Sequence, residues 1–158
     1  MSDKYAKSFV MYKPRRSGDG SASQWSIASN RECMFLEMSN QTGKDKNGNA
    51  TFAWADKIIF KLGEGDIGEL LAVIAGVKRG VGPLDTNKGK HKGLFHTNDK
   101  GNSVLYFARD QNTNCLNIFL STKKGDEKTI AKHTITDGEA CVLGTLLRRA
   151  IEIMYKWD

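Results

Sequence analysis

The chain has 158 residues and a formal net charge of +6 at pH 7, and 39% of its residues are hydrophobic. This length predicts one compact domain whose core needs no disulfide or metal. We find no apolar run near the roughly 20 residues of a membrane span, and no secretory signal stretch at the N-terminus. Cys33, Cys115 and Cys141 each lie in an apolar pattern, which favours buried free thiols in an intracellular, reducing compartment.

Four short strands are predicted in the first part of the chain. They cover residues 9–13, 21–29, 33–40 and 51–62, and polar or glycine-containing segments separate them. The fourth strand shows the clearest alternation of apolar and polar side chains. Its apolar face would carry Phe52, Trp54, Ile58, Phe60 and Leu62. Lys57 and Lys61 lie on the opposite face, so this strand should have one buried and one solvated side.

A capping residue three positions before a glutamate marks the start of each predicted helix. Asp66 precedes Glu69, and Thr136 precedes Glu139. This spacing lets the capping side chain accept the third amide of the helix, and it lets Glu139 reach back to the amide of Thr136. The first helix continues through the apolar run at 70–74, and the second, which is amphipathic, ends near Trp157.

The second part of the chain repeats this order of elements. Strands are predicted at 94–97, 103–109, 115–122 and 128–135, with a tight turn at 99–102. We therefore predict an α+β fold of two tandem ββββα repeats with two antiparallel four-stranded sheets. One domain, residues 1–158, would hold repeat one at 8–77, a glycine- and lysine-rich connector at 78–93, and repeat two at 94–157.

Signals of catalysis and of metal binding are missing from the sequence. His91, His96 and His133 lie in different predicted elements without a spaced acidic or thiol partner. There is no CxxC pair, no G-x-S-x-G turn, and no Walker spacing around the lysine pair of Lys88-Gly89-Lys90. We therefore expect no enzymatic activity, no metal and no cofactor.

Basic side chains gather in the first strand and its turn, in the connector, and around the last hairpin. Such clusters suit a polyanion, because each neutralised phosphate releases condensed counterions. An antiparallel sheet that is covered by helices on one face leaves its other face open to a ligand. The basic residues expected at this site are Lys13, Arg15, Arg16, Lys57, Lys61, Lys88, Lys90, Lys92 and Lys123.

Amide and aromatic side chains would complete the site. Gln24 can form hydrogen bonds with bases or sugars, and Tyr12, Trp25 and Phe95 can stack on unpaired bases. For Trp25, packing in the core is the alternative to stacking. The sequence therefore predicts a protein that binds single-stranded nucleic acid.

The element order resembles that of Whirly-type single-stranded-DNA-binding proteins and of their half-length relatives, which are transcriptional coactivators. Within the first repeat, Gly18-Asp19-Gly20-Ser21-Ala22-Ser23-Gln24-Trp25 is similar to the second strand of those relatives. Lys88-Gly89-Lys90 resembles the Lys-Gly-Lys stretch of plant Whirly proteins. In this chain the stretch lies just before the fifth predicted strand. The resemblance therefore implies only that these residues contact phosphate.

This resemblance implies two sheets packed almost at right angles and a central helix bundle that holds a tetramer. It also implies that single-stranded DNA runs across and between the sheets with little sequence preference, in replication, repair, recombination or transcription. The broad apolar face of the last helix independently favours a homo-oligomer, either a dimer or a tetramer, over a self-sufficient monomer. The alternatives are an RNA-binding or RNA-annealing protein on the same fold, and a transcription regulator that acts through protein contacts.

Overall fold

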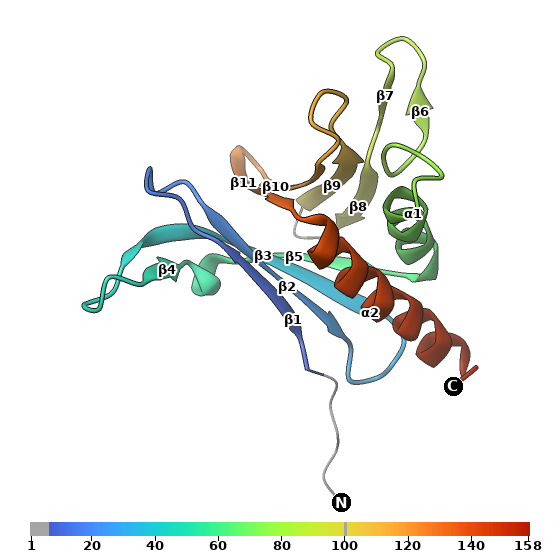
Figure 1. Ribbon diagram of the computed structural model, residues 1–158, viewed down its shortest axis with the longest axis horizontal. Coiled ribbons are helices and arrows are strands. Elements are labelled where there is room, and N and C mark those ends of the chain that lie inside the picture. The colour runs from blue at the N-terminus through green and yellow to red at the C-terminus, as the bar shows by residue number, and fades with distance from the viewer. Residues whose placement is uncertain (1–6, 100) are drawn as a thin grey trace, which may run out of the picture.

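The structure is a computed structural model that describes residues 7–99 and 101–158, and two larger antiparallel sheets dominate these residues (Figure 1). In the first sheet the order is β1–β2–β3, and both β4 and β5 pair with β3. Its strands are β1 (Phe9–Lys13), β2 (Ser21–Ile27), β3 (Met34–Lys44), β4 (Ala50–Phe52) and β5 (Ile58–Leu62). The order of the second sheet is β11–β10–β9–β8. Its strands are β8 (Leu94–Asn98), β9 (Gly101–Arg109), β10 (Leu116–Lys124) and β11 (Glu127–Ile135).

The helices α1 (Glu64–Ile74) and α2 (Asp137–Tyr155) contact each other, and α1 also contacts β5 and β9. One hydrophobic core joins both sheets to both helices, with Phe60, Ile67, Leu105 and Leu143 among its fully buried members. Neither α1 nor α2, the helices in the described part of the chain, is long and apolar enough to cross a membrane. The predicted α+β class and the antiparallel sheets are confirmed, whereas an internal duplication stays a prediction.

The predicted fourth strand is wrong as a single element. The chain forms β4, then a 3₁₀ helix at Trp54–Asp56, and only then β5. The register of β3 shifts between Gln41 and Gly43, so β4 and β5 pair with different ends of this long strand. The chain must turn to pass from one pairing to the other. Phe52 and Trp54 continue the apolar alternation through this turn, which hides it in the sequence.

The two helix starts differ in how well they follow the predicted caps. Thr136 Oγ1 accepts the Glu139 amide at 3.1 Å, and Glu139 Oε1 accepts the Thr136 amide at 2.9 Å, so this capping box is confirmed. The prediction for Asp66 is wrong, because α1 begins earlier and Gly63 is its N-cap residue. Asp66 instead lies in the first turn, where its carboxylate accepts the Gly63 amide at 3.1 Å.

Thr136→Ala should lower the free energy of unfolding by about 1 kcal/mol, because the amide of Glu139 loses its acceptor at the start of α2. Thr136→Ser keeps a hydroxyl and serves as the matched control. Urea denaturation of the three proteins measures the difference. Equal midpoints for the alanine and wild-type proteins would show that this cap contributes nothing.

The connector contains a hairpin that the sequence did not predict, made of β6 (Leu84–Asp85) and β7 (Lys90–His91). Its base is held by Glu69 on α1, whose Oε1 accepts the Gly82 amide at 2.8 Å and Lys78 Nζ at 2.7 Å. The hydrogen bond from Lys78 lowers the pKa of Glu69. Gly82 has a φ of +82°, and a Cβ there would lie 2.2 Å from the carbonyl oxygen of Gly93, so this close approach requires glycine.

The prediction of buried thiols holds for Cys33 alone. Cys33 is buried, whereas Cys115 and Cys141 are exposed, and all three are free. Cys115 precedes β10 in a loop, where its amide donates to Thr113 Oγ1 at 3.3 Å. Cys141 lies on the side of α2 that faces away from the core.

A buried chain of hydrogen bonds joins β2 in the first sheet to β11 in the second. Trp25 Nε1 donates to Ser23 Oγ at 3.2 Å, and the Ser21 hydroxyl donates to the carbonyl oxygen of Lys132. Ser21 Oγ lies 2.9 Å from His133 Nδ1, and Ser23 Oγ lies 3.0 Å from His133 Nε2. Because the Ser21 proton is already used, Nδ1 must donate to Ser21, and Nε2 then accepts from the Ser23 hydroxyl. Every donor and acceptor in this hydrogen-bonded series has a partner only if His133 is neutral.

Stability should therefore fall in mild acid. Burial, together with the positive charge of Lys13, lowers the pKa of His133 to about 4. An unfolded histidine titrates near pH 6.5, so between about pH 4 and 6.5 the unfolded chain binds more protons and stability rises with pH. The stabilisation from neutral His133 is complete above this pH window. As pH falls through the window, the free energy of unfolding drops by about 3 kcal/mol.

Urea denaturation at several pH values, on wild-type protein and on His133→Gln, measures this dependence. The comparison isolates His133 from carboxylates whose pKa is also lowered, such as Asp19 and Asp110, because both proteins retain them. We expect a shallower pH dependence for the variant, whatever its absolute stability. Identical slopes in the two proteins would contradict the assignment.

Candidate nucleic-acid interface

A groove separates strand β5, at the edge of the first sheet, from the neighbouring ends of the second sheet. Two adjoining cavities form it, with volumes of about 350 and 560 Å³, and both are lined by Thr122 and Lys124. Other residues of the first cavity include Phe35, Ile59, Lys61, His96 and Ser103. Other residues of the second include Asp56, Lys57, Glu127 and Thr129. We call these two cavities together the inter-sheet groove.

The alternation of β5 places its side chains on the two sides of the first sheet. Ile58, Phe60 and Leu62 are buried, while Ile59 is 50% exposed and Lys61 is exposed. Lys61 is paired in register with Phe35 of β3, so a lysine and an aromatic residue from neighbouring strands both line the groove. This pairing of charge and ring is what a phosphate and a neighbouring base require.

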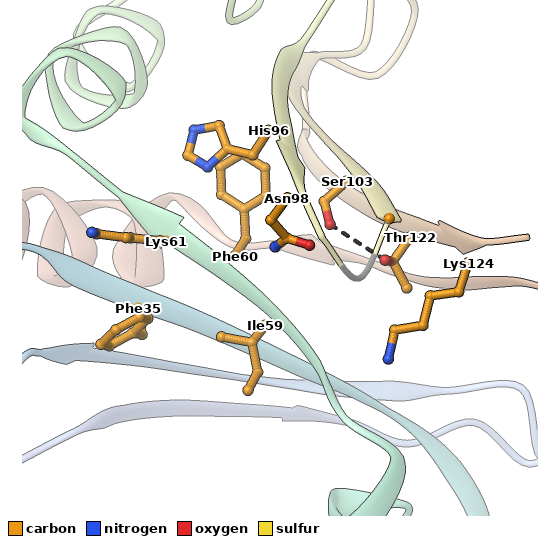
Figure 2. Close-up of a pocket in the computed structure, with 10 residues that line it drawn as sticks. Phe35, Ile59, Phe60, Lys61, His96, Asn98, Ser103, Thr122 and Lys124 are labelled. Carbon is orange, nitrogen blue, oxygen red and sulfur yellow. Dashed lines mark hydrogen bonds between the residues drawn. The ribbon is translucent and has the colours of Figure 1, made fainter.

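The opposite wall of the groove comes from β8, β9, β10 and the start of β11. Figure 2 shows Lys124 extending from the second sheet toward β5, with Ser103 and Thr122 joined by a hydrogen bond of 3.3 Å beside it. No acidic side chain of the described residues lines the first cavity, where Lys61 and Lys124 supply the charge. The second cavity is mixed, because Asp56 and Glu127 lie there with Lys57 and Lys124.

Of the residues predicted for the site, Lys57 and Lys61 line this groove. Lys57 Nζ lies 2.6 Å from Glu37 Oε2, so its charge is already paired with a carboxylate. Lys61 has no ion-pair partner among the described residues. Of the two lysines, Lys61 is therefore the one whose charge is not already paired within the described residues.

Trp25 is a correction to the predicted site. Its ring is fully buried in the core, and its Nε1 is bonded to Ser23, so it cannot stack on a base in this structure. The alternation of β2 explains the error, because Ser21, Ser23 and Trp25 all point toward the core. The core packing named as its alternative is the arrangement that the structure shows.

Lys13 also faces inward. Its ammonium group forms an ion pair with Glu139 on α2, and about a quarter of its side chain is exposed. Burial acts to raise the pKa of Glu139, but the hydrogen bond from Lys13 and the amide of Thr136 lower it overall. Lys13 therefore holds the first sheet to α2, and only a small part of it can reach a ligand.

Other predicted residues lie on the uncovered face of the first sheet or in its turns. Tyr12 is 57% exposed, and its ring lies 5.5 Å from that of Phe52. Gln24 is half-buried on the same face as Tyr12. Arg15 and Arg16 are exposed in the turn between β1 and β2, where Arg15 lies 3.7 Å from Asp19.

The remaining predicted residues are spread over the second sheet and the β6–β7 hairpin. Phe95 is 62% exposed on β8, and Lys123 is exposed on β10. The three lysines of the hairpin are exposed. These are Lys88, Lys90 and Lys92. Figure 1 shows this hairpin projecting on the opposite side of the molecule from the turn between β1 and β2, so the predicted residues do not form one compact cluster.

Sequence reasoning missed Phe35, Ile59, His96 and Lys124. A signal existed for Phe35, which alternates with the buried Met34 and Leu36. A signal also existed for Lys124, because it belongs to the basic cluster of the last hairpin and alternates with Lys123 across the strand. The position of His96 depends on how the two sheets meet, which no local pattern reports.

Comparison of the sequence with family models and with curated proteins gives no match. Among solved structures, the plant transcriptional regulator PBF-2 is similar, with 16% identity, a TM-score of 0.69, and coverage of 99% of this chain and 86% of that one. WHY1 from Arabidopsis thaliana has 15% identity, a TM-score of 0.68, and coverage of 99% and 89%. A guide-RNA-binding protein complex bound to a gRNA has 11% identity, a TM-score of 0.68, and coverage of 94% and 92%. The chain therefore has the Whirly-type fold that the sequence resemblance predicts.

Proposed function

We propose that this protein binds single-stranded DNA with little sequence specificity. The observation that carries the proposal is the inter-sheet groove, whose first cavity is lined by Lys61, which has no ion-pair partner among the described residues, by its register partner Phe35, and by Lys124 from the second sheet. Lysines bind the phosphates, while aromatic and apolar side chains such as Phe35 and Ile59 contact the bases. The likeness to PBF-2 and WHY1 supports this proposal through the shared fold.

The preference for single strands follows from the lining of the groove. An unpaired base can turn its flat face toward Phe35 or Ile59, whereas a duplex hides these faces within its own stack. The polar side chains beside them include Asn98 and the hydroxyl groups of Ser103 and Thr122, which bond to each other. Most of the other lining groups are apolar or positively charged and contact base faces or phosphates, so we expect weak dependence on sequence.

An RNA ligand is the second candidate, and the specific observation that favours it is the structural likeness to a guide-RNA-binding complex. Stacking and phosphate contacts serve both nucleic acids, so the groove by itself does not choose between them. Competition between DNA and RNA oligonucleotides of matched sequence decides the question. Stronger competition by RNA would favour RNA binding or annealing.

We also propose that the protein self-associates through its helices. Val142 on α2 is 53% exposed and Tyr155 at its end is 47% exposed, which is consistent with a helix-mediated dimer or tetramer. We propose a role in replication, repair, recombination or transcription, with regulation through protein contacts as the alternative. The free cysteines are consistent with a reducing, intracellular compartment. We propose no enzymatic activity and no cofactor.

Binding should be strong for single strands, weak for duplex, and steeply dependent on salt. If about three phosphates are neutralised, a fourfold rise in salt should lower the affinity roughly twentyfold, from a slope of about 0.7 per phosphate. Fluorescence anisotropy with single- and double-stranded oligonucleotides at two salt concentrations measures both effects, on protein sized by light scattering. Absence of oligonucleotide binding at moderate salt, together with co-purification of a protein partner, would overturn the proposal.

A further inference from the structure

His96 stands at one end of the first groove cavity, and no sequence signal assigned it a part in binding. Its Nε2 lies 3.1 Å from Asp66 Oδ2 at the start of α1. Its ring stacks on Phe60, with centroids 4.2 Å apart and an interplanar angle of 25° (Figure 2). A third of the side chain is exposed, so both protons and a ligand in the groove can reach it.

The contact with Asp66 fixes which nitrogen of His96 carries the proton. The same Asp66 oxygen accepts the Gly63 amide at 3.1 Å, which holds the carboxylate in place. A carboxylate is only an acceptor, so Nε2 must be the donor. In the neutral ring Nδ1 is then a bare acceptor, and no described residue donates to it. The lone pair of this unprotonated nitrogen repels a phosphate oxygen.

Protonation reverses this property. Nδ1 becomes a donor, the ring becomes a cation, and a charge-assisted hydrogen bond to a phosphate oxygen becomes available. The charged groups that contact the ring or line the same cavity are Asp66 from α1, Lys61 from β5 and Lys124 from β10.

We propose that His96 is a proton-dependent phosphate ligand of the inter-sheet groove. This inference rests on the proposed function and adds a regulation to the same site. Proton uptake accompanies binding, so affinity for a single strand rises as pH falls.

The experiment is an anisotropy titration with rhodamine-labelled oligothymidylate, whose bases do not titrate between pH 5.5 and 8. At constant ionic strength the wild-type protein should bind about tenfold more tightly near pH 5.5 than near pH 8, the ratio that one charge-assisted hydrogen bond supports. His96→Gln keeps an amide donor for Asp66 and carries no charge at any pH. Its affinity should not change over the same range.

His91→Gln is the matched control. His91 lies on β7, outside the groove, and its Nδ1 bonds to the carbonyl oxygen of Gly82 at 2.8 Å. This variant should keep the full pH dependence. His133 does not contribute, because its pKa of about 4 lies below the range tested.

A second readout is independent of affinity. At neutral pH, the imidazole NMR signals that disappear in His96→Gln should move toward their protonated positions when oligothymidylate is added to wild-type protein. Binding without pH dependence, or a full pH dependence in His96→Gln, would overturn this inference and leave the proposed function standing. Absence of binding at every pH would overturn both.

Discussion

Replacing Lys61 and Lys124 together by glutamate should weaken binding to a single strand about a hundredfold at low salt. The change removes the two lysines that line the first cavity and sets two anions against the phosphates. The salt dependence should become shallower as well, since two fewer phosphates are neutralised. Anisotropy titrations at several salt concentrations measure both effects. Both lysines are exposed, so stability should stay within about 0.5 kcal/mol of the wild type.

Lys44→Glu/Lys46→Glu is the matched control for this experiment. It makes the same change in net charge at exposed positions in and after β3, outside the groove. If binding falls equally in both double variants, net charge rather than the groove determines affinity. We choose Lys124 over Lys57, because Lys57→Glu would bring a second carboxylate against Glu37 and disturb the sheet itself.

Trp25→Ala should destabilise the protein by about 3–5 kcal/mol, the range for removing a large buried aromatic side chain. The ring is fully buried between β2 and the core, and its loss also leaves Ser23 without the indole donor. Trp25→Phe, which fills more of the space, should cost less. Chemical denaturation followed by circular dichroism gives the three free energies of unfolding.

The same variants separate a structural role for Trp25 from a role in binding. We expect any Trp25 variant that is still folded to bind oligonucleotides as the wild type does. A stable alanine variant that has lost binding would show that Trp25 contacts the ligand and that the burial described above does not persist in the complex.

The element order could be predicted because most strands carry local signals. The alternation in 9–13 and 128–135, and the capping box at Thr136 and Glu139, depend only on neighbouring residues. The break between β4 and β5 could not be predicted, since it arises from the long β3 pairing with two partners in succession. The β6–β7 hairpin escaped notice because its strands are only two residues long. The predicted turn at 99–102 includes Lys100, which lies outside the described residues.

The candidate site was predictable in chemistry but only partly in position. Alternation correctly placed Lys57 and Lys61 away from the core, because one strand determines that choice. It could not show that Lys57 forms an ion pair with Glu37, since this pair depends on the packing of β3 beside β5. The positions of His96 and Lys124 depend on the meeting of two sheets that are distant in sequence, and long-range geometry of this kind leaves no local pattern.

Two side chains of the first sheet form hydrogen bonds to the backbone of β11, and these bonds affect how the outer border of the second sheet can pair with other molecules. Asn40 Nδ2 donates to the carbonyl oxygen of Ile130 at 2.8 Å, and the Ser21 hydroxyl donates to that of Lys132. These carbonyl groups lie on the border of the second sheet where an incoming strand from another molecule would have to dock. An incoming strand would have to break both of these hydrogen bonds, so the contact with the first sheet shields this part of the border from pairing with another molecule.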